Sequence, residues 1–318
     1  MNKLKKELLI VIVTYNSKKF INQCLSPFKN MPKEWEILVI DNKSQDDTLE
    51  IIKKDFPFVK IIESQNNSGF GAANNIGLSY ALKENFEHVF LLNHDAYISV
   101  ENLKELIKVQ KNNPDCYIIS PIHYDGTNQK LDRGFREYVK SSNDFIEDSV
   151  IGKYKKEVYE VDFVNAAMWL MNKKCIEEIG GFSPTFYHYG EDKNYTDRLN
   201  FHNKKCAITP LAKGVHDRAQ RGKTSFEEKY TLEYREICIK VSNPNENFGK
   251  NIKKILRRLF KKSLNKNYFK LFLKVLNNKK AFLQNYKLSK TINANFLQEF
   301  NSKIVNALER ERERERAS

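Results

Sequence analysis

Polar side chains follow four apolar runs of the chain, each at the point where the run ends. These groups are Thr14-Tyr15-Asn16-Ser17, Asp41-Asn42-Lys43-Ser44, the stretch 66–71 and Asn93-His94-Asp95. In an open parallel sheet, ligands bind outside the carboxyl ends of the strands. The carboxylates, amides, hydroxyls and imidazole of these groups should therefore converge on one cleft that binds a polar ligand.

The spacing of other residues argues against three familiar sites. Gly69, Gly71 and Gly77 form G-x-G-x5-G after the third apolar run, whereas a dinucleotide site needs G-x-G-x-x-G after the first. The sequence Gly222-Lys223-Thr224 ends like a P-loop, but Asp217 stands where that motif needs glycine. The adjacent Glu191 and Asp192 point in different directions, whereas a glycosidase needs two carboxyl groups flanking the bond, about 5 to 10 Å apart.

Short β-branched runs alternate with amphipathic stretches up to about residue 120, which predicts a parallel sheet with crossover helices. The predicted strands are Leu8–Val13, Glu36–Ile40, Val59–Ile62, Val89–Leu92 and Tyr117–Ile119. One predicted helix carries Phe20, Cys24 and Phe28 on one face, and a second begins at Ser44 with acids in its first turn. The fold class is therefore α/β.

The remaining chain is predicted in three parts. Turn-forming residues predict loops or a peripheral hairpin over 121–160. A strand is expected from Val161 to Met171, followed by a short helix that ends at Gly180-Gly181, and the pattern is helical beyond Ser225. We expect two regions, an α/β domain over 1–225 and a helical, basic region over 226–318.

Six motifs in one order carry a family resemblance. They read VIVTYNS, VIDNKSQDDT, NNSGFGAANNIG, LLNHDAYI and GGFSPTFYHYGEDKNYTDRL, with His216 later in the chain. This series resembles family 2 glycosyltransferases with the GT-A fold, and most the bacterial rhamnosyltransferase-type branch, over residues 8 to about 225. The resemblance implies a GT-A catalytic domain over 1–225, with a nucleotide-sugar half at about 1–120 and an acceptor half at about 121–225. Its implied fold is a Rossmann-like and mostly parallel sheet flanked by helices.

The resemblance also implies a nucleotide-sugar site. In it, Asp41 would accept the imino N–H of a uracil or thymine base, although a turn carboxylate after a strand is the structural alternative. Glycine at position 69 would let the backbone approach the nucleotide. The implied residues are Thr14, Tyr15, Asn16, Asp41, Asn42, Ser44, Asn67, Gly69, Phe70, Asn74, Asn93 and His94.

A metal is implied beside the donor diphosphate. Of Asn93-His94-Asp95 only Asp95 is acidic, so one carboxylate would hold Mn²⁺ or Mg²⁺ with oxygens from the diphosphate and water. His216 resembles a further ligand and would favour Mn²⁺. The alternative for a lone histidine is a structural role.

Asp192, in the pair with Glu191, is implied as the base that deprotonates the acceptor hydroxyl, which predicts single displacement with inversion. Its structural alternative is a first-turn acid that stabilises the helix dipole.

Trp169, Tyr187 and Tyr189 would stack on acceptor sugars or pack in the core. Arg218, Arg221 and Lys223 would close over the diphosphate or lie in water.

The net charge of +14 is concentrated in one segment. Residues 249–290 hold 14 Lys or Arg and no acid, so the rest of the chain has 54 − 14 = 40 basic against 40 acidic residues. The segment also carries an apolar stripe at helical spacing. This pattern predicts either an interfacial helix on anionic lipid or a helix that packs onto the catalytic domain or within a homo-oligomer, and nucleic-acid binding is the third and least favoured alternative. The alternating Glu and Arg of 309–316 predict a solvated helix end or a loose tail, or an added scar.

Other sequence features favour a cytoplasmic protein, one that could lie peripherally at the inner face of the plasma membrane. The first apolar run is six residues long, too short for a signal peptide or a spanning helix. The five cysteines are widely spaced and form no C-x-x-C pair, which supports neither disulfides nor zinc.

The predicted function is transfer of a sugar from a nucleotide donor to a glycan or lipid-linked glycan in surface polysaccharide synthesis. The first candidate donor is dTDP-rhamnose, with UDP-hexose or UDP-galactofuranose as alternatives. A catalytically silent glycan-assembly protein is the alternative from another class.

Overall fold

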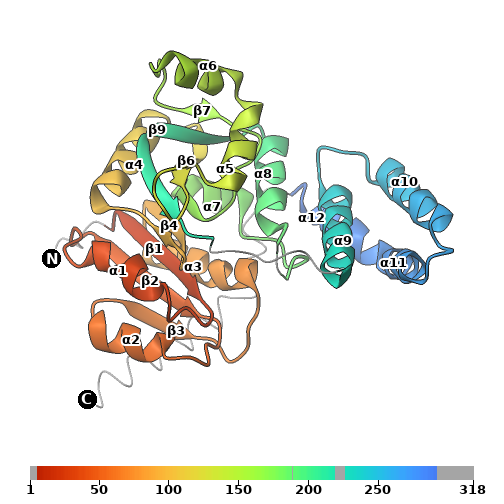
Figure 1. Ribbon diagram of the computed structural model, residues 1–318, viewed down its shortest axis with the longest axis horizontal. Coiled ribbons are helices and arrows are strands. Elements are labelled where there is room, and N and C mark those ends of the chain that lie inside the picture. The colour runs from red at the N-terminus through yellow and green to blue at the C-terminus, as the bar shows by residue number, and fades with distance from the viewer. Residues whose placement is uncertain (1–5, 188, 219–225, 292–318) are drawn as a thin grey trace.

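A computed structural model describes residues 6–187, 189–218 and 226–291 of the 318-residue chain (Figure 1). Its strands are β1 (Leu8–Thr14), β2 (Trp35–Asp41), β3 (Lys60–Glu63), β4 (His88–Asn93), β5 (Ala96–Tyr97), β6 (Cys116–Tyr124), β7 (Tyr159–Glu160), β8 (Met168–Asn172) and β9 (Lys205–His216). Its helices before β9 are α1 (Ile21–Leu25), α2 (Thr48–Asp55), α3 (Phe70–Glu84), α4 (Val100–Asn112), α5 (Arg133–Tyr138), α6 (Asn143–Ile151), α7 (Lys173–Ile179) and α8 (Glu191–Phe201), with 3₁₀ turns at Ser26–Phe28 and Val139–Ser141.

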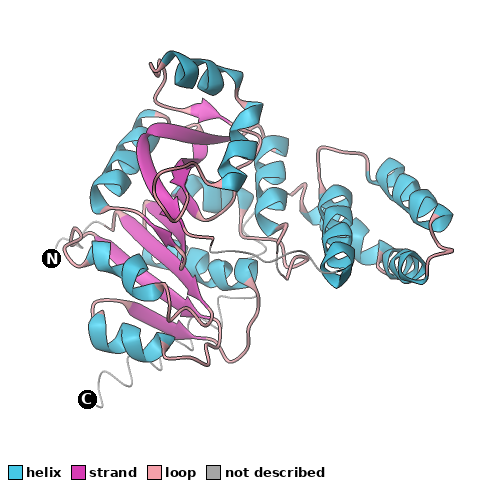
Figure 2. Ribbon diagram, in the orientation of Figure 1, coloured by secondary structure: helices cyan, strands magenta, loops and turns pink. Residues whose placement is uncertain are grey.

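The sheet has a parallel half and a mixed half (Figure 2). Its described strands run in the order β3-β2-β1-β4-β8-β6-β9-β5, with β7 paired to β9. The first four are parallel, which confirms the predicted α/β class, whereas β8 runs antiparallel to both β4 and β6. Residues of β1 alternate between two buried clusters, because successive side chains point to opposite faces of a strand.

The sequence-based prediction is wrong over part of the middle of the chain. Residues 121–160 begin with a short antiparallel turn closed by the Tyr124–Leu131 bridge, but they also hold the helices α5 and α6, where only loops or a hairpin were expected. Of the strand expected at 161–171, only the part from Met168 is extended in the sheet, and the preceding residues form a loop. The sequence-based prediction also missed β9, which is interrupted by Pro210 and a register shift and therefore lacks a continuous apolar run.

After β9 every described element is a helix. These helices are α9 (Phe226–Ser242), α10 (Phe248–Lys261), α11 (Lys266–Asn277) and α12 (Lys279–Leu288). They form a third apolar cluster, in which Ile237 and Val241 of α9 join Ile255 of α10 and Val275 of α11. No helix among the described residues is both long and apolar enough to cross a membrane. The tail over 309–318 lies outside the described residues.

Candidate functional site

A cavity of about 840 Å³ lies beyond the carboxyl ends of β1, β2 and β4, where the sheet order predicts a ligand site. The cavity brings together most of the site residues predicted from the sequence. Those that line it are Tyr15, Asn42, Asn67, Gly69, Phe70, Asn93, His94, Asp95, Tyr187, Tyr189, Glu191, Asp192 and His216. Those that do not are Thr14, Asn16, Asp41, Ser44, Asn74 and Trp169.

Asp41 lies just behind the cavity wall and its carboxylate is already occupied. Thr14 Oγ1 donates to Asp41 Oδ1 at 2.9 Å, while the backbone N–H of Ser44 donates to Oδ2 at 2.9 Å. The side chain is 1% exposed. In this structure Asp41 therefore acts as a turn carboxylate, the structural alternative to base recognition, and Thr14 and Ser44 are its partners.

Two asparagines tie together the loops that follow β1, β2 and β3 at one end of the cavity. Asn16 accepts from the backbone N–H of Gln45 at 2.8 Å, which ties the loop after β1 to the loop after β2. Asn42 Nδ2 donates to Asn67 Oδ1 at 2.9 Å and to the carbonyl of Gly69 at 3.3 Å. Because these bonds are made by side chains within the loops, the polar edge is preformed.

Gly69 is required by a neighbouring loop of the protein itself. It has a φ of +84°, and a Cβ atom built on it would lie 1.9 Å from the carbonyl oxygen of Tyr187. The glycine thus admits the backbone of the loop that precedes α8, which is a reason different from the expected close approach to a nucleotide. Asn74 is buried within α3 and donates to the carbonyl of Phe70 at 3.0 Å.

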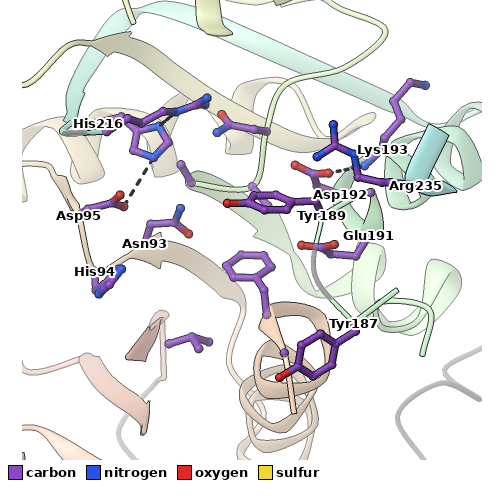
Figure 3. A pocket seen from close by; sticks show the side chains of 18 of the residues that line it. Asn93, His94, Asp95, Tyr187, Tyr189, Glu191, Asp192, Lys193, His216 and Arg235 are labelled. Carbon is purple, nitrogen blue, oxygen red and sulfur yellow. Dashed lines mark hydrogen bonds and ion pairs between the residues drawn. The ribbon is translucent and has the colours of Figure 1, made fainter. Parts of the chain in front are cut away.

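Asp95 and His216 face each other at one side of the cavity (Figure 3). Asp95 Oδ1 lies 3.6 Å from His216 Nε2 and is buried without a hydrogen-bond partner in the described part of the chain. Burial acts to raise the pKa of Asp95, but His216 and His94 outweigh it, and the pKa lies below its ordinary value. The carboxylate is therefore ionised and open to a cation.

This donor set fits a hard divalent cation that takes most of its ligands from elsewhere. Asn93 Oδ1, like Asp95 Oδ1, is buried without a hydrogen-bond partner among the described residues. No cluster of three or more His, Cys, Asp or Glu side chains suited to a metal occurs among the described residues. A cation at Asp95 would therefore need oxygens from a diphosphate or water to complete its shell.

Arg218 binds the ring of His216, which is the second candidate metal ligand. Its Nε–H donates to His216 Nδ1 at 3.1 Å, and its guanidinium lies 3.4 Å from Asp132 at the start of α5. Since Nδ1 accepts this bond, the proton of the neutral imidazole lies on Nε2, toward Asp95. His216 could bind a metal through Nε2 only after Arg218 released Nδ1. Arg221 and Lys223, which were predicted to act with Arg218, lie outside the described residues.

Glu191 and Asp192 open α8 on the other side of the cavity (Figure 3). Burial, followed by the charge of Asp192, raises the pKa of Glu191 to about 8. Burial also raises the pKa of Asp192, although the backbone N–H of Lys193 donates to its carboxylate at 2.8 Å. The pair therefore holds a proton more tightly than two exposed acids at a helix N-terminus would.

The predicted acceptor aromatics divide into two groups. Tyr187 and Tyr189 are 63% and 40% exposed and line the cavity. Tyr189 adopts a left-handed conformation with a φ of 66°, which is uncommon outside glycine and often marks a functional site. Trp169 has no exposed surface, and its Nε1–H donates to the carbonyl of Val164 at 3.1 Å. It packs in the core, so the prediction that Trp169 contacts an acceptor is wrong.

The C-terminal helices contribute to the cavity wall, which the sequence-based prediction missed. Arg235, Glu236 and Ile239 of α9 line it. The Arg235 guanidinium lies 5.4 Å from the ring centre of Tyr189, and its charge counteracts the raised pKa values of both carboxylates of α8. The ordinary amphipathic pattern of α9 carries no signal for this contact. Other missed lining residues are Val13, Tyr138, Phe163, Asn165, Ala166, Ala167, Gly190 and Lys193.

The sequence matches the glycosyl transferase family 2 profile over residues 9–180, which is more than half of the chain. The protein therefore belongs to glycosyltransferase family 2. The low-salt glycan biosynthesis hexosyltransferase Agl10 of Haloferax volcanii is 25% identical over 252 residues, which cover 78% of this chain and 79% of Agl10.

Two further relatives are matched over a smaller part of their length. The prophage-derived glycosyltransferase SunS of Bacillus subtilis is 36% identical over 100 residues, which are 31% of this chain and 22% of SunS. The dTDP-rhamnosyl transferase RfbF of Shigella flexneri is 28% identical over 123 residues, or 38% of this chain and 40% of RfbF. The partial match to RfbF supports the rhamnosyltransferase-type branch only weakly.

Solved structures of similar shape confirm the GT-A-like fold. S. aureus TarS 1–349 in complex with UDP-GlcNAc has a TM-score of 0.55 at 16% identity, covering 89% of this chain and 90% of TarS 1–349. The mannosyltransferase PcManGT of Pyrobaculum calidifontis, in complex with GDP-Man and Mn²⁺, has a TM-score of 0.54 at 15% identity, covering 90% of this chain and 73% of PcManGT.

Proposed function

We propose that this family 2 glycosyltransferase transfers a sugar from a nucleoside diphosphate to a glycan or lipid-linked glycan acceptor, with inversion and with the aid of a divalent cation. One observation carries the proposal. Two carboxylates face one cavity in opposite electrostatic environments, with the pKa of Asp95 lowered and that of Asp192 raised. Environments that push two pKa values apart are typical of groups with different roles.

Asp95 is assigned to the donor side. An ionised carboxylate with a free buried oxygen would hold Mn²⁺ or Mg²⁺, and His216 would join it once Arg218 releases the ring. When bound, the cation would neutralise charge on the leaving diphosphate. The freed guanidinium of Arg218 could then donate to diphosphate oxygens.

Asp192 is assigned as the general base. Glu191 is 4% exposed and retains its proton to about pH 8, whereas Asp192 is half-buried and faces the cavity. Asp192, the more exposed of the two carboxylates, is therefore the member of the pair placed to accept the proton of an acceptor hydroxyl. A single base with an activated leaving group corresponds to one displacement, and hence to inversion at the anomeric carbon.

The donor proposed for first testing is dTDP-rhamnose, supported by the match to RfbF over 123 residues. UDP-hexoses are the closest alternatives, since TarS was solved with UDP-GlcNAc, and UDP-galactofuranose is a further one. The acceptor is proposed to belong to surface polysaccharide synthesis, in line with the glycan pathway named for Agl10.

Thermal-shift titration with dTDP, UDP and GDP, each with and without Mn²⁺, tests the donor site. We expect one nucleotide to raise the melting temperature, and Mn²⁺ to increase that shift in the wild type but not in Asp95→Asn. A matched control is Asp115→Asn, which removes an exposed carboxylate from the turn before β6. Absence of a metal-dependent shift with all three nucleotides would refute the assignment of Asp95.

A catalytically silent glycan-assembly protein is the second candidate. It is favoured by the single acid of Asn93-His94-Asp95 and by the engagement of His216 with Arg218. Nucleotide binding without hydrolysis or transfer from any of the candidate donors would select it.

A further inference from the structure

The basic C-terminal helices carry two apolar faces, of which one is packed. Ile252, Ile255 and Leu259 of α10 and Leu271 and Val275 of α11 are buried in the cluster with α9. A second set of large apolar residues, on the same helices and in the turn between them, is exposed to solvent. This set, the exposed apolar face, consists of Phe260, Leu264, Phe269, Leu273 and Leu276.

The exposed apolar face is continuous across the two helices. Phe269, Leu273 and Leu276 follow the i, i+4, i+7 spacing of one helical side. The half-buried Phe272 beside them lies 5.8 Å, between ring centres, from Phe260 at the end of α10. Phe260 is 66% exposed and Leu264 is fully exposed in the turn between the helices. Contiguous apolar patches of this kind on a protein surface mark interaction sites.

The segment that carries this face is strongly basic. Residues 249–290 contain 14 Lys or Arg and no acid. On α10, Lys253 and Arg257 precede Phe260 at spacings that place them on its side of the helix, and on α11 Lys266 stands one turn before Phe269. Of the 14 cations, only Arg258 has an ion-pair partner, Glu233, among the described residues.

We infer that the exposed apolar face docks on an anionic lipid bilayer. The bilayer supplies both partners that the face lacks, since lipid phosphates can pair with the lysines while acyl chains receive the aromatic and leucine side chains. A second copy of the chain fits less well, because a two-fold contact through this face would bring together two basic segments without an acid between them. Figure 1 shows α10 and α11 at the end of the molecule, away from the sheet.

The buried face of α10 and α11 connects the exposed apolar face to the cavity through α9. α9 lines the cavity through Arg235 and Ile239 and packs on α10 and α11 through Ile237 and Val241. The membrane-facing helices and the cavity therefore share one wall, and docking would set the distance of the cavity from the bilayer. The two leading interpretations of the segment, packing and membrane contact, are compatible because different residues serve each.

Vesicle flotation of the full chain tests the inference. Vesicles of phosphatidylcholine alone are compared with vesicles that also contain phosphatidylglycerol, at low and high salt. We expect binding to the anionic vesicles only, weakened by salt. Phe269→Ser with Leu273→Ser should reduce the bound fraction about tenfold or more, and Lys266→Gln with Lys270→Gln should reduce it as well. Ile146→Ser with Val150→Ser, a matched pair of exposed apolar residues on α6, should leave it unchanged.

The variants also separate docking from folding and from other partners. Their melting temperatures and nucleotide-induced shifts should match those of the wild type, so that lost flotation reports lost docking. If Phe269→Ser with Leu273→Ser lowers the melting temperature, flotation of the variant Lys266→Gln with Lys270→Gln alone tests the inference. Equal binding to neutral vesicles, unchanged binding in the lysine variant, or a change from dimer to monomer in the serine variant without lipid binding would each overturn the inference.

Discussion

Glu191 and Asp192 are adjacent in sequence, yet the structure separates their surroundings. The Glu191 side chain is buried, and its Oε2 has no hydrogen-bond partner among the described residues, whereas Asp192 accepts from the backbone N–H of Lys193 and faces the cavity. This difference in exposure separates the two carboxylates into a proposed proton holder, Glu191, and a proposed proton acceptor, Asp192. This division leads to two different predictions for two conservative substitutions.

Asp192→Asn should abolish transfer and leave nucleotide binding near that of the wild type. Loss of a positioned general base lowers rate constants about 10²- to 10⁴-fold, and the amide keeps the size of the side chain. Glu191→Gln is the control, since the glutamine imitates a carboxyl that is already protonated at neutral pH. Transfer is measured at saturating donor. A near-normal kcat in Asp192→Asn would mean that another residue acts as the general base.

Glu191→Gln should stabilise the protein at neutral and alkaline pH. The pKa of Glu191 is raised from 4.5 to about 8 on folding, so the folded state holds a proton that the unfolded state releases. The free energy of unfolding of the wild type therefore falls as pH rises from about 4.5 to 8, by an amount on the order of a few kcal/mol. Urea unfolding at pH 5 and pH 8 should show a gain for the variant at pH 8 only. An equal gain at both pH values would contradict the assignment.

Gly69→Ala should destabilise the protein and weaken nucleotide binding. The added methyl group would lie 1.9 Å from the Tyr187 carbonyl oxygen, so the loop before α8 must move. Gly152→Ala isolates the backbone cost, because Gly152 has a similar φ of +75° but no neighbour within 4 Å of its Cβ position. Unfavourable φ alone should cost about 1 kcal/mol, and Gly69→Ala should cost more. Equal melting temperatures for the two variants would exclude the clash.

Arg198→Lys should lower stability although it keeps the charge. The Arg198 guanidinium is fully buried, donates to the carbonyls of Gly181 and Ile179, and stacks over the Tyr195 ring at 5.0 Å. Lysine cannot reproduce the planar fork, so a buried carbonyl loses its donor, at a cost of about 1–3 kcal/mol. Arg257→Lys on the exposed side of α10 is the control and should have no effect in urea unfolding.

The parallel half of the fold was predictable from sequence because its strands read as apolar runs, and three of them, β1, β2 and β4, are buried on both faces. β9 was not, since it carries Pro210 and Lys213 and is shaped by pairing with three other strands. Pairing between segments far apart in the chain leaves little trace in local periodicity.

Only part of the candidate site was predictable from sequence, for the same reason. Residues directly after strands, such as Tyr15 and Asp95, were placed correctly at the cavity because strand ends converge. Sequence could not show that Asp41 is satisfied by Thr14 and Ser44, or that Trp169 turns into the core, because both depend on which face of a strand end meets solvent. Nor could it show that Arg235 of α9 returns to the cavity, since that contact depends on how α9 packs against the catalytic domain.

The long strand β9 has a consequence for making hybrid enzymes. α8 begins with the carboxylate pair and leads through a short turn into β9, which ends at His216. Asp192 and His216, which lie on opposite sides of the cavity, thus belong to one uninterrupted stretch, 191–216. Chimaeras with a related transferase should exchange this stretch whole. A junction in the turn at 202–204 would join α8 of one protein to β9 of another, and the lengths of the two elements would not be matched to each other.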